Sequence, residues 1–355
     1  MAKLKLKPGI VTGDNLRELF DYCKSVECAL PAVNVIGSHS ANAALQAARE
    51  AKSPIIVQLS NGGAHFFAGT FLDKAQGPIT GGIAGALYVR SVAEAYGVPV
   101  VLHTDHASKK LLPWIEGMLD YGQKFFEQHK EPLFSSHMLD LSEEPLNENL
   151  EICRSMLGRM KQLNMCLEIE LGVTGGEEDG VDNTDVDNSK LYTQPEEVLQ
   201  AYDVLQPVGA FTVAASFGNT HGVYKPGNVK LTPKILRNSQ TLIKEKRKTG
   251  DKPVDFVFHG GSGSTPEEIR EAVSYGVVKM NIDTDTQWAF TRPIKKYMDE
   301  KDAYLHTQLG NPEGPDKPNK KQIDPRAWLH LGEKEMVGRL VQACKDLNSF
   351  EKFDI

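Results

Sequence analysis

Short runs of apolar, mostly β-branched residues recur along the chain, and stretches with helical spacing separate them. Such runs predict buried strands, because parallel strands covered on both faces are nearly continuous hydrophobic segments. Eight runs occur, at residues 31–36, 54–59, 99–103, 133–138, 165–171, 209–216, 254–259 and 277–282. The fourth is the weakest prediction, since Ser135, Ser136 and His137 are poor strand formers.

Helical patterns fill the intervals between the runs. Residues 42–51 and 149–163 carry apolar positions at helical spacing. Two more helices are predicted to begin at Thr193 and Thr265, because each threonine is closely followed by proline and has glutamate three residues on. In this capping box the two side chains satisfy backbone N–H groups that the first turn leaves without a helical partner.

Strands that alternate with helices imply a parallel sheet with helical crossovers. Eight such units favour a closed (β/α)8 TIM barrel, with an open doubly wound sheet as the alternative. Because barrels of about 250 residues and more fold as single units, we expect one α/β barrel domain over residues 1–355.

Two segments depart from the alternation. Residues 172–192 are glycine-rich and acidic, and they are too many for a plain connection, which predicts a mobile active-site loop. Residues 309–325 are rich in proline, glycine and lysine and precede a helix expected at about 328–348. We therefore expect residues 309–355 to form an exposed excursion and a C-terminal helix.

Composition excludes several classes of protein. The 40 basic and 47 acidic residues give a net charge of −7 with no basic stripe, so nucleic acid is not an expected partner. No 18-residue apolar run occurs and the basic N-terminus lacks a following apolar segment, so neither a membrane span nor a secretory signal is expected. Five cysteines without a CxxC motif fit a reducing compartment. Together these features predict a cytoplasmic protein.

Polar residues end nearly every predicted strand. Barrel active sites lie at the C-terminal ends of the strands, so these residues would gather at one face. They are Asn34, Ser60 and Asn61, the HTDH segment at 103–106, Asp140, Glu168 and Glu170, Asn219 and His221, the HGGSG segment at 259–263, and the NIDT segment at 281–284.

Three of these residues suggest a metal site. His106, His221 and His259 follow the third, sixth and seventh strands. Three neutral imidazoles leave one position of a zinc ion open, as catalysis requires. The alternative for each histidine alone is a capping or structural polar residue, which is our interpretation of His103 and His137.

The segment HGGSGS at 259–264 precedes a predicted helix. Its glycines allow successive N–H groups to converge on an anion, and the helix dipole adds attraction. The spacing matches neither common nucleotide motif. A phosphate site is therefore predicted, with a plain tight turn as the alternative.

The acidic residues of the 172–192 loop have two interpretations. Such loops are usually solvated surface. Beside a metal site, a carboxylate such as Glu178 could instead close over the substrate as a general base.

Longer motifs carry a family resemblance. They are HTDHASKKLLPW (103–114), LEIELGVTGGEEDGVDN (167–183), SFGNTHGVYKPGN (216–228), FVFHGGSGS (256–264) and KMNIDTDTQWA (279–289). With these motifs the chain resembles class II fructose-bisphosphate aldolases of the longer, dimeric subgroup, essentially from Lys7 to the end. The resemblance implies reversible cleavage of D-fructose 1,6-bisphosphate to dihydroxyacetone phosphate and D-glyceraldehyde 3-phosphate.

The resemblance also implies the metals. His106, His221 and His259 resemble the ligands of a catalytic Zn²⁺ that stabilises the enediolate, and Asp140 and Glu170 resemble ligands of a second metal position. A monovalent cation, K⁺ or Na⁺, is a further candidate cofactor.

Three residues match the catalytic groups of the family. Asp105 resembles the group that protonates the C4 oxygen, and Glu178 resembles the base that removes the C1 proton of dihydroxyacetone phosphate. Asn281 resembles the residue that hydrogen-bonds the enediolate.

The remaining matches concern substrate binding. The cradle for the dihydroxyacetone phosphate end comprises Gly222, Gly260, Gly261, Ser262, Asp283 and Thr284. Ser60 matches a contact to the other end of the substrate, and Asn34 is a further candidate contact. Arg326 resembles an arginine that reaches the site from the partner subunit, which implies a homodimer.

Three alternatives remain open at this stage. A metal-free aldolase would use a Schiff-base lysine, for which Lys279 is the natural candidate because it lies in the eighth strand. A sugar-phosphate binding protein without catalysis is the second alternative. The third is the same reaction on tagatose 1,6-bisphosphate, which differs only in the configuration at C4.

Overall fold

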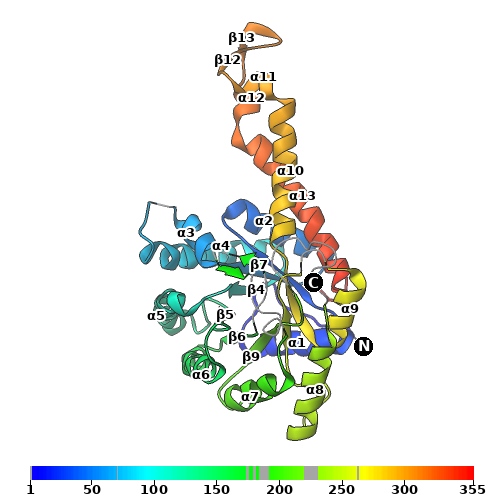
Figure 1. Cartoon of the computed structure of the whole chain (residues 1–355). Helices are drawn as coiled ribbons and strands as arrows, with labels where there is room; N and C mark the ends of the chain where they lie inside the picture. The colour runs from blue at the N-terminus through cyan, green and yellow to red at the C-terminus, as the bar shows by residue number, and fades with distance from the viewer. Residues whose placement is uncertain are drawn as a thin grey trace.

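The computed structural model describes residues 2–69, 71–172, 176–178, 181–183, 192–219, 231–261 and 264–355. Within them, eight parallel strands form a closed barrel surrounded by helices (Figure 1). The strands are β2 (Leu30–Asn34), β3 (Ile55–Leu59), β4 (Pro99–Thr104), β5 (Ser136–Leu139), β6 (Cys166–Leu171), β9 (Phe211–Ala215), β10 (Phe256–Phe258) and β11 (Val277–Asn281). The pairing of β4 with β5 closes the ring. The predicted TIM barrel and its eight strands are therefore confirmed.

Helices cover the outside of the barrel and bury its outer apolar face. They are α2 (Ser38–Ala51), α3 (Asn61–Ala68), α4 (Gln76–Tyr96), α5 (Leu112–His129), α6 (Leu146–Gln162), α7 (Pro195–Leu205), α8 (Lys234–Arg247), α9 (Pro266–Ser274) and α10 (Thr284–Glu300), with a 3₁₀ turn at Lys109–Leu111. Among the helices of the described residues, none is long and apolar enough to cross a membrane.

The polar strand β5 is joined to β4 by hydrogen bonds of its own side chains and of Ser135, the residue before it. Ser135 Oγ accepts from the Leu102 N–H at 2.9 Å, and the hydroxyl of Ser136 lies 2.7 Å from His103 Nδ1. One residue further on, His137 Nδ1 lies 2.8 Å from the hydroxyl of Thr104. These contacts join β5 to β4, which explains why residues with low strand propensity form a strand here.

Of the two predicted capping boxes, the one at α9 lies where the sequence predicted it and the one at α7 does not. At α9 the box is present, since Thr265 Oγ1 accepts from the Glu268 N–H and Glu268 accepts from the Thr265 N–H. At α7 the box lies one residue later, between Gln194 and Glu197. Thr193 is fully buried and donates its hydroxyl to the Leu171 carbonyl instead, so that prediction was wrong by one position.

One end of the barrel is closed by apolar packing. The first helix, α1 (Gly13–Val26), follows the short strand β1 (Gly9–Ile10), which pairs with the start of β4. Leu16, Leu19 and Phe20 of α1 pack with Phe353 near the C-terminus in a second core cluster. The strands begin at this end, so their C-terminal ends face the other opening of the barrel.

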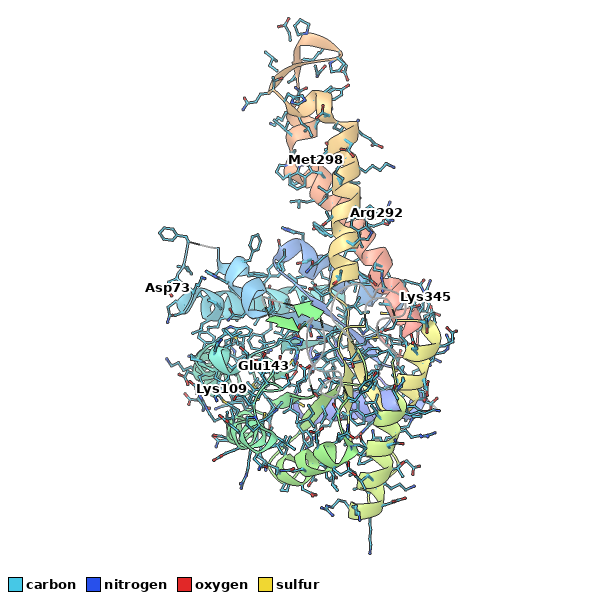
Figure 2. The ribbon with its side chains drawn as sticks, viewed as in Figure 1. Asp73, Lys109, Glu143, Arg292, Met298 and Lys345 are labelled. Atoms are coloured by element: carbon cyan, nitrogen blue, oxygen red, sulfur yellow. The ribbon has the colours of Figure 1, made fainter. Side chains whose placement is uncertain are left out.

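The C-terminal part of the chain forms an arm that projects from the barrel (Figure 1). It consists of the outer part of α10, then α11 (Asp302–Leu305), the antiparallel pair β12 (Leu309–Asn311) and β13 (Gly314–Pro318), α12 (Lys320–Ile323) and α13 (Pro325–Asp346). Arg292 of α10 pairs with Glu335 of α13. Figure 2 shows Arg292 and Met298 along the projecting helix and Lys345 where α13 returns to the barrel.

Candidate metal centre and active site

The C-terminal ends of four barrel strands supply a cluster of histidines and carboxylates. Asp105 and His106 follow β4, Asp140 follows β5, Glu170 lies near the end of β6, and His259 follows β10. All five are buried or nearly so. His106 has a left-handed backbone with φ of 29°, which is uncommon for a residue with a side chain and aims the ring into the cluster.

The cluster contains two sets of atoms that could hold a cation. One set comes from Asp105, His106 and His259, and the other from His106, Asp140 and Glu170. Within each set the candidate ligand atoms lie within 4.8 Å of one another. Imidazole nitrogens and carboxylate oxygens are ligands that suit Zn²⁺. The structure therefore brings together two of the predicted zinc ligands and both residues predicted for a second metal.

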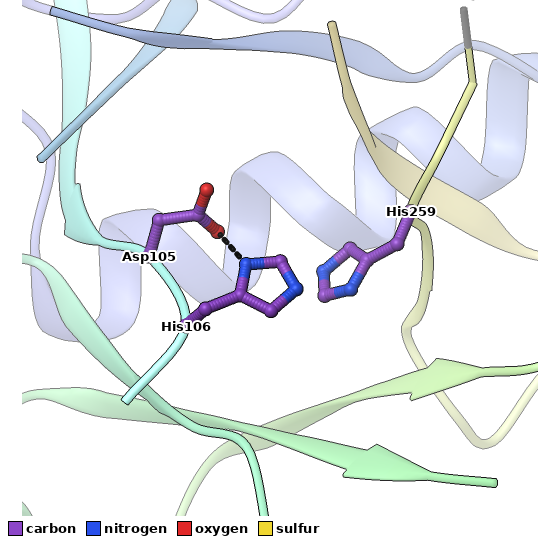
Figure 3. Close-up of side chains that lie close together, drawn as sticks. All are labelled: Asp105, His106 and His259. Atoms are coloured by element: carbon purple, nitrogen blue, oxygen red, sulfur yellow. Dashed lines mark ion pairs between the residues drawn. The ribbon is translucent and has the colours of Figure 1, made fainter. Parts of the chain in front are cut away.

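Carboxylate oxygens lie close to the nitrogens of both rings, and Figure 3 shows the two rings with Asp105. His106 Nδ1 lies 3.1 Å from Asp105 Oδ1, and its Nε2 lies 3.5 Å from Glu170 Oε2. His259 Nε2 lies 2.9 Å from Glu168 Oε1, and its Nδ1 lies 3.3 Å from Glu170 Oε2. Nε2 of His106 and Nδ1 of His259 thus approach the same carboxylate oxygen, and the ring centroids are 4.6 Å apart.

The electrostatics of the centre favour positive charge. Burial lowers the pKa of His259, but Glu170 and Glu168 outweigh burial and raise it to about 9. Burial and the neighbouring Glu170 raise the pKa of Asp140. Burial also acts to raise the pKa of Asp105, but His106 in particular holds it well below the usual value. Carboxylates gathered at this density favour a cation among them.

A chain of amides supports Asp105. Asn34 Nδ2 donates to Asp105 Oδ2 at 3.1 Å, and Asn281 Nδ2 donates to Oδ1 at 3.1 Å. Gln58 in turn donates from Nε2 to Asn34 Oδ1 at 2.5 Å. Two predicted site residues, Asn34 and Asn281, are therefore brought to the predicted proton-transfer group, and Gln58 is a buried support that the sequence did not reveal.

The predicted phosphate-binding residues lie around the same opening. Ser60 caps α3 by accepting from the Gly63 N–H at 3.1 Å. Gly260 has a φ of 59°, and an added Cβ at Gly261 would lie 2.2 Å from Met280 Cε, so the close packing explains the glycine at this position. Asp283 precedes α10 and accepts from Gln287 at 2.8 Å, and Thr284 is the first residue of that helix.

Several predicted residues lie outside the described structure. His221, Gly222 and Ser262 are not among the described residues, and neither is most of the 172–192 segment. Glu178 is described only as part of the backbone of β7 (Gly176–Glu178), which pairs with β8 (Val181–Asn183). Their roles remain predictions.

Arg326 lies apart from the cluster. It sits in the first turn of α13, its side chain is 90% exposed, and it pairs with Asp324. The C-terminal part of this helix, from Met336 to Cys344, is the part that packs into the core. A helix of 22 residues is about 33 Å long, so Arg326 lies at the end of α13 that is far from the core.

A buried ion pair, which the sequence did not predict, lies inside the barrel. Lys279 Nζ is 2.7 Å from Glu168 Oε1, and both side chains are at most 3% exposed. Glu168 alternates with Glu170 on β6, and Lys279 alternates with Asn281 on β11, so each lies on the inner face of its strand. The ion pair occupies the amine of Lys279, which argues against its use as a Schiff-base nucleophile.

The fold and the site together define a barrel enzyme of the metal-dependent kind. The family model described as "Fructose-bisphosphate aldolase class-II" matches residues 14–352. A fructose-bisphosphate aldolase of Haemophilus influenzae is 58% identical over 98% of this chain and 99% of its own length. The "Fructose-bisphosphate aldolase class 2" of Escherichia coli K12 is 57% identical over 98% of both chains.

A solved structure agrees with these relatives. The crystal structure of fructose-bisphosphate aldolase from Campylobacter jejuni matches with a TM-score of 0.89 and 54% identity, covering 98% of each chain. The chain belongs to the class II fructose-bisphosphate aldolase family, whose members are metal-dependent lyases.

Proposed function

We propose that this protein cleaves D-fructose 1,6-bisphosphate reversibly to dihydroxyacetone phosphate and D-glyceraldehyde 3-phosphate. The observation that carries the proposal is the gathering of Asp105, His106 and His259 at the C-terminal end of the barrel, in a chain of the class II aldolase family. The relatives described above are named for this activity, and they match the chain along nearly their full length.

The residues fit a zinc ion. His106 and His259 would supply two imidazole ligands and His221 the third, while Asp140 and Glu170 would serve a second metal position. Bound zinc would act as a Lewis acid that stabilises negative charge on the substrate oxygens. We also infer that a monovalent cation, K⁺ or Na⁺, assists; this rests on the family resemblance alone.

The protein's own groups would move the two protons. Asp105, whose pKa is held low, can accept the C4 hydroxyl proton during cleavage and return it during condensation. Glu178 would exchange the proton at C1 of dihydroxyacetone phosphate when its loop covers the site. Asn281, already bonded to Asp105, would hold the enediolate oxygen by a hydrogen bond.

The two phosphates would orient the reacting carbons through remote binding energy. We assign the dihydroxyacetone phosphate end to the cradle of Gly222, Gly260, Gly261, Ser262, Asp283 and Thr284. Ser60 and Asn34 would contact the other half of the substrate.

We propose that the protein is a homodimer in which Arg326 serves the partner's site. Its exposed side chain on the projecting arm supports this, because the outer end of a long helix is better placed to reach a second subunit. We place the protein in the cytoplasm, since all five cysteines are buried and free.

Comparing the cleavage of two epimeric bisphosphates would test the proposed substrate. Zinc-loaded protein should cleave fructose 1,6-bisphosphate much faster than tagatose 1,6-bisphosphate, and chelator-treated protein should cleave neither until zinc is returned. Faster cleavage of the tagatose epimer would overturn the substrate, and full activity in verified metal-free protein would overturn the metal-dependent reaction.

A further inference from the structure

The buried pair Glu168–Lys279 lies next to the metal centre but outside both sets of candidate ligands. The two residues come from β6 and β11, which are separated in the barrel by β10 and β9. Their contact therefore crosses the interior of the barrel. Charged side chains are costly in such a position unless they are paired, so their presence calls for a specific reason.

Glu168 connects this pair to a proposed zinc ligand. Its Oε1 lies 2.7 Å from Lys279 Nζ and 2.9 Å from His259 Nε2, and its Oε2 lies 3.5 Å from His103 Nε2. An ionised carboxylate accepts hydrogen bonds but cannot donate them, so Nε2 of His259 must be the donor. The lone pair of the neutral ring is then on Nδ1, the atom that faces Glu170 and the centre.

The backbone of His259 is fixed as well as its ring. Asn219 Nδ2 donates to the carbonyl of His259 at 3.0 Å. With the backbone held by Asn219 and the ring by Glu168, His259 has little freedom to turn Nδ1 away from the cluster.

On this geometry we propose that Glu168 is the positioning residue for His259 and that Lys279 holds Glu168 in place. Glu168 sets the tautomer and the direction of the ring, and Lys279 balances a charge that has no access to water. The inference rests on the proposed zinc-dependent function, and neither residue would touch substrate. Outer partners of this kind typically change metal affinity about 10- to 100-fold when they are removed.

Zinc affinity, measured by competition with a chromophoric chelator, tests the proposal directly. Glu168→Gln should raise the zinc dissociation constant by about 10- to 100-fold, because a neutral amide accepts more weakly and can turn its NH₂ toward the ring. Cobalt substituted for zinc should show altered d–d absorption bands in this variant, since the orientation of His259 would be less well defined.

A double variant separates positioning from simple stability. Glu168→Gln alone leaves Lys279 as an unpaired buried charge, which could reduce folding. Glu168→Gln combined with Lys279→Met removes both charges with little change in volume, so thermal unfolding of the metal-free protein should recover toward the unmodified value. Zinc affinity should remain low, because the carboxylate that orients His259 is still missing.

A half-buried ion pair in the same part of the chain provides the control. Asp255 lies four residues before His259, ahead of the other end of β10, and pairs with Lys24 at 2.6 Å. Asp255→Asn should lower the unfolding temperature without changing zinc affinity. If the double variant binds zinc as tightly as the unmodified protein, the proposal is wrong, even when Glu168→Gln fails to fold. Failure of the unmodified protein to bind zinc would instead refute the proposed function.

Discussion

Replacement of Asp105 by asparagine should separate catalysis from folding. In the native site Asp105 Oδ2 accepts from Asn34 and Oδ1 accepts from Asn281, each at 3.1 Å. Asparagine has the same shape but presents an NH₂ group in place of one oxygen. It can neither accept the C4 proton nor return it, so the proposed proton transfer would be lost.

The surrounding amides allow the fold to survive this change. If the new NH₂ faces Asn34, the side-chain amide of Asn34 must rotate by half a turn so that its oxygen faces position 105. The amide of Gln58 must then rotate as well. Gln58 Oε1 is buried and has no hydrogen-bond partner within the described structure, so it could then accept from Asn34. The rotation exchanges one buried polar atom without a partner for another, and we expect a loss of stability of no more than about 1–2 kcal/mol.

The effect on catalysis should be much larger. A positioned acid–base group typically contributes about 10²- to 10⁴-fold. The middle of this range, about 10³-fold in kcat, corresponds to about 4 kcal/mol of transition-state free energy. Release of triose phosphates from fructose 1,6-bisphosphate measures kcat and KM, and metal analysis verifies that zinc is bound.

Two outcomes would refute this reasoning. A zinc-loaded Asp105→Asn variant with kcat within tenfold of the unmodified protein would show that another group moves the C4 proton. A fall in unfolding temperature well beyond about 5 °C would show that the amide chain cannot reverse. Asp203→Asn, at an exposed carboxylate of α7 that pairs with Arg247, serves as control and should retain full kcat.

Three further predictions follow from other parts of the molecule. Glu178→Ala should lower kcat by about 10²-fold or more with little change in KM, and unchanged kcat would reject its role as base. Arg326→Ala and Asp105→Asn proteins should each be poorly active, but mixed dimers should regain one complete site; no recovery on mixing would argue against a contribution from the partner. Gly81→Ala should cost about 1–3 kcal/mol, measured by chemical denaturation, because the new Cβ would lie 1.7 Å from the Ala64 carbonyl where α4 crosses α3. Gly158→Ala, with no neighbour within 4 Å, is the matched control.

The barrel could be predicted because each of its strands is recognisable from its own sequence. Each buried parallel strand is a run of apolar residues, and such a run can be identified without knowing which strands lie beside it. The antiparallel pairs β7–β8 and β12–β13 escaped prediction for the opposite reason. Their sequences, such as GEE and GPDKP, contain no apolar alternation, and β12 and β13 are largely exposed. The strand predicted at residues 133–138 was only weakly signalled by its sequence, because it depends on hydroxyl and imidazole contacts to β4.

The residues of the candidate site that lie at the end of a strand could be predicted from their position in the sequence. His106 and His259 each stand at the end of a strand, and barrel geometry brings such ends together. Glu168 and Lys279 could not be paired in the same way, since their contact joins two strands that are not neighbours in the sheet. Alternation does show that both residues share an inner face with Glu170 and Asn281. That signal would have identified them as interior charges, but not as partners.

Three buried histidines show why the residue type alone does not assign a metal ligand. His103 and His137 each place Nδ1 within 2.8 Å of a hydroxyl, and burial lowers the pKa of both to about 3. His259 is equally buried, but a carboxylate lies within 3.3 Å of each of its ring nitrogens and its pKa is raised to about 9. A ring between two carboxylates lies where a cation is favoured, whereas a ring bonded to a hydroxyl serves as a neutral hydrogen-bonding group. The partners, which are set by the barrel, therefore distinguish the ring that lies in the candidate metal centre from the two that lie outside it.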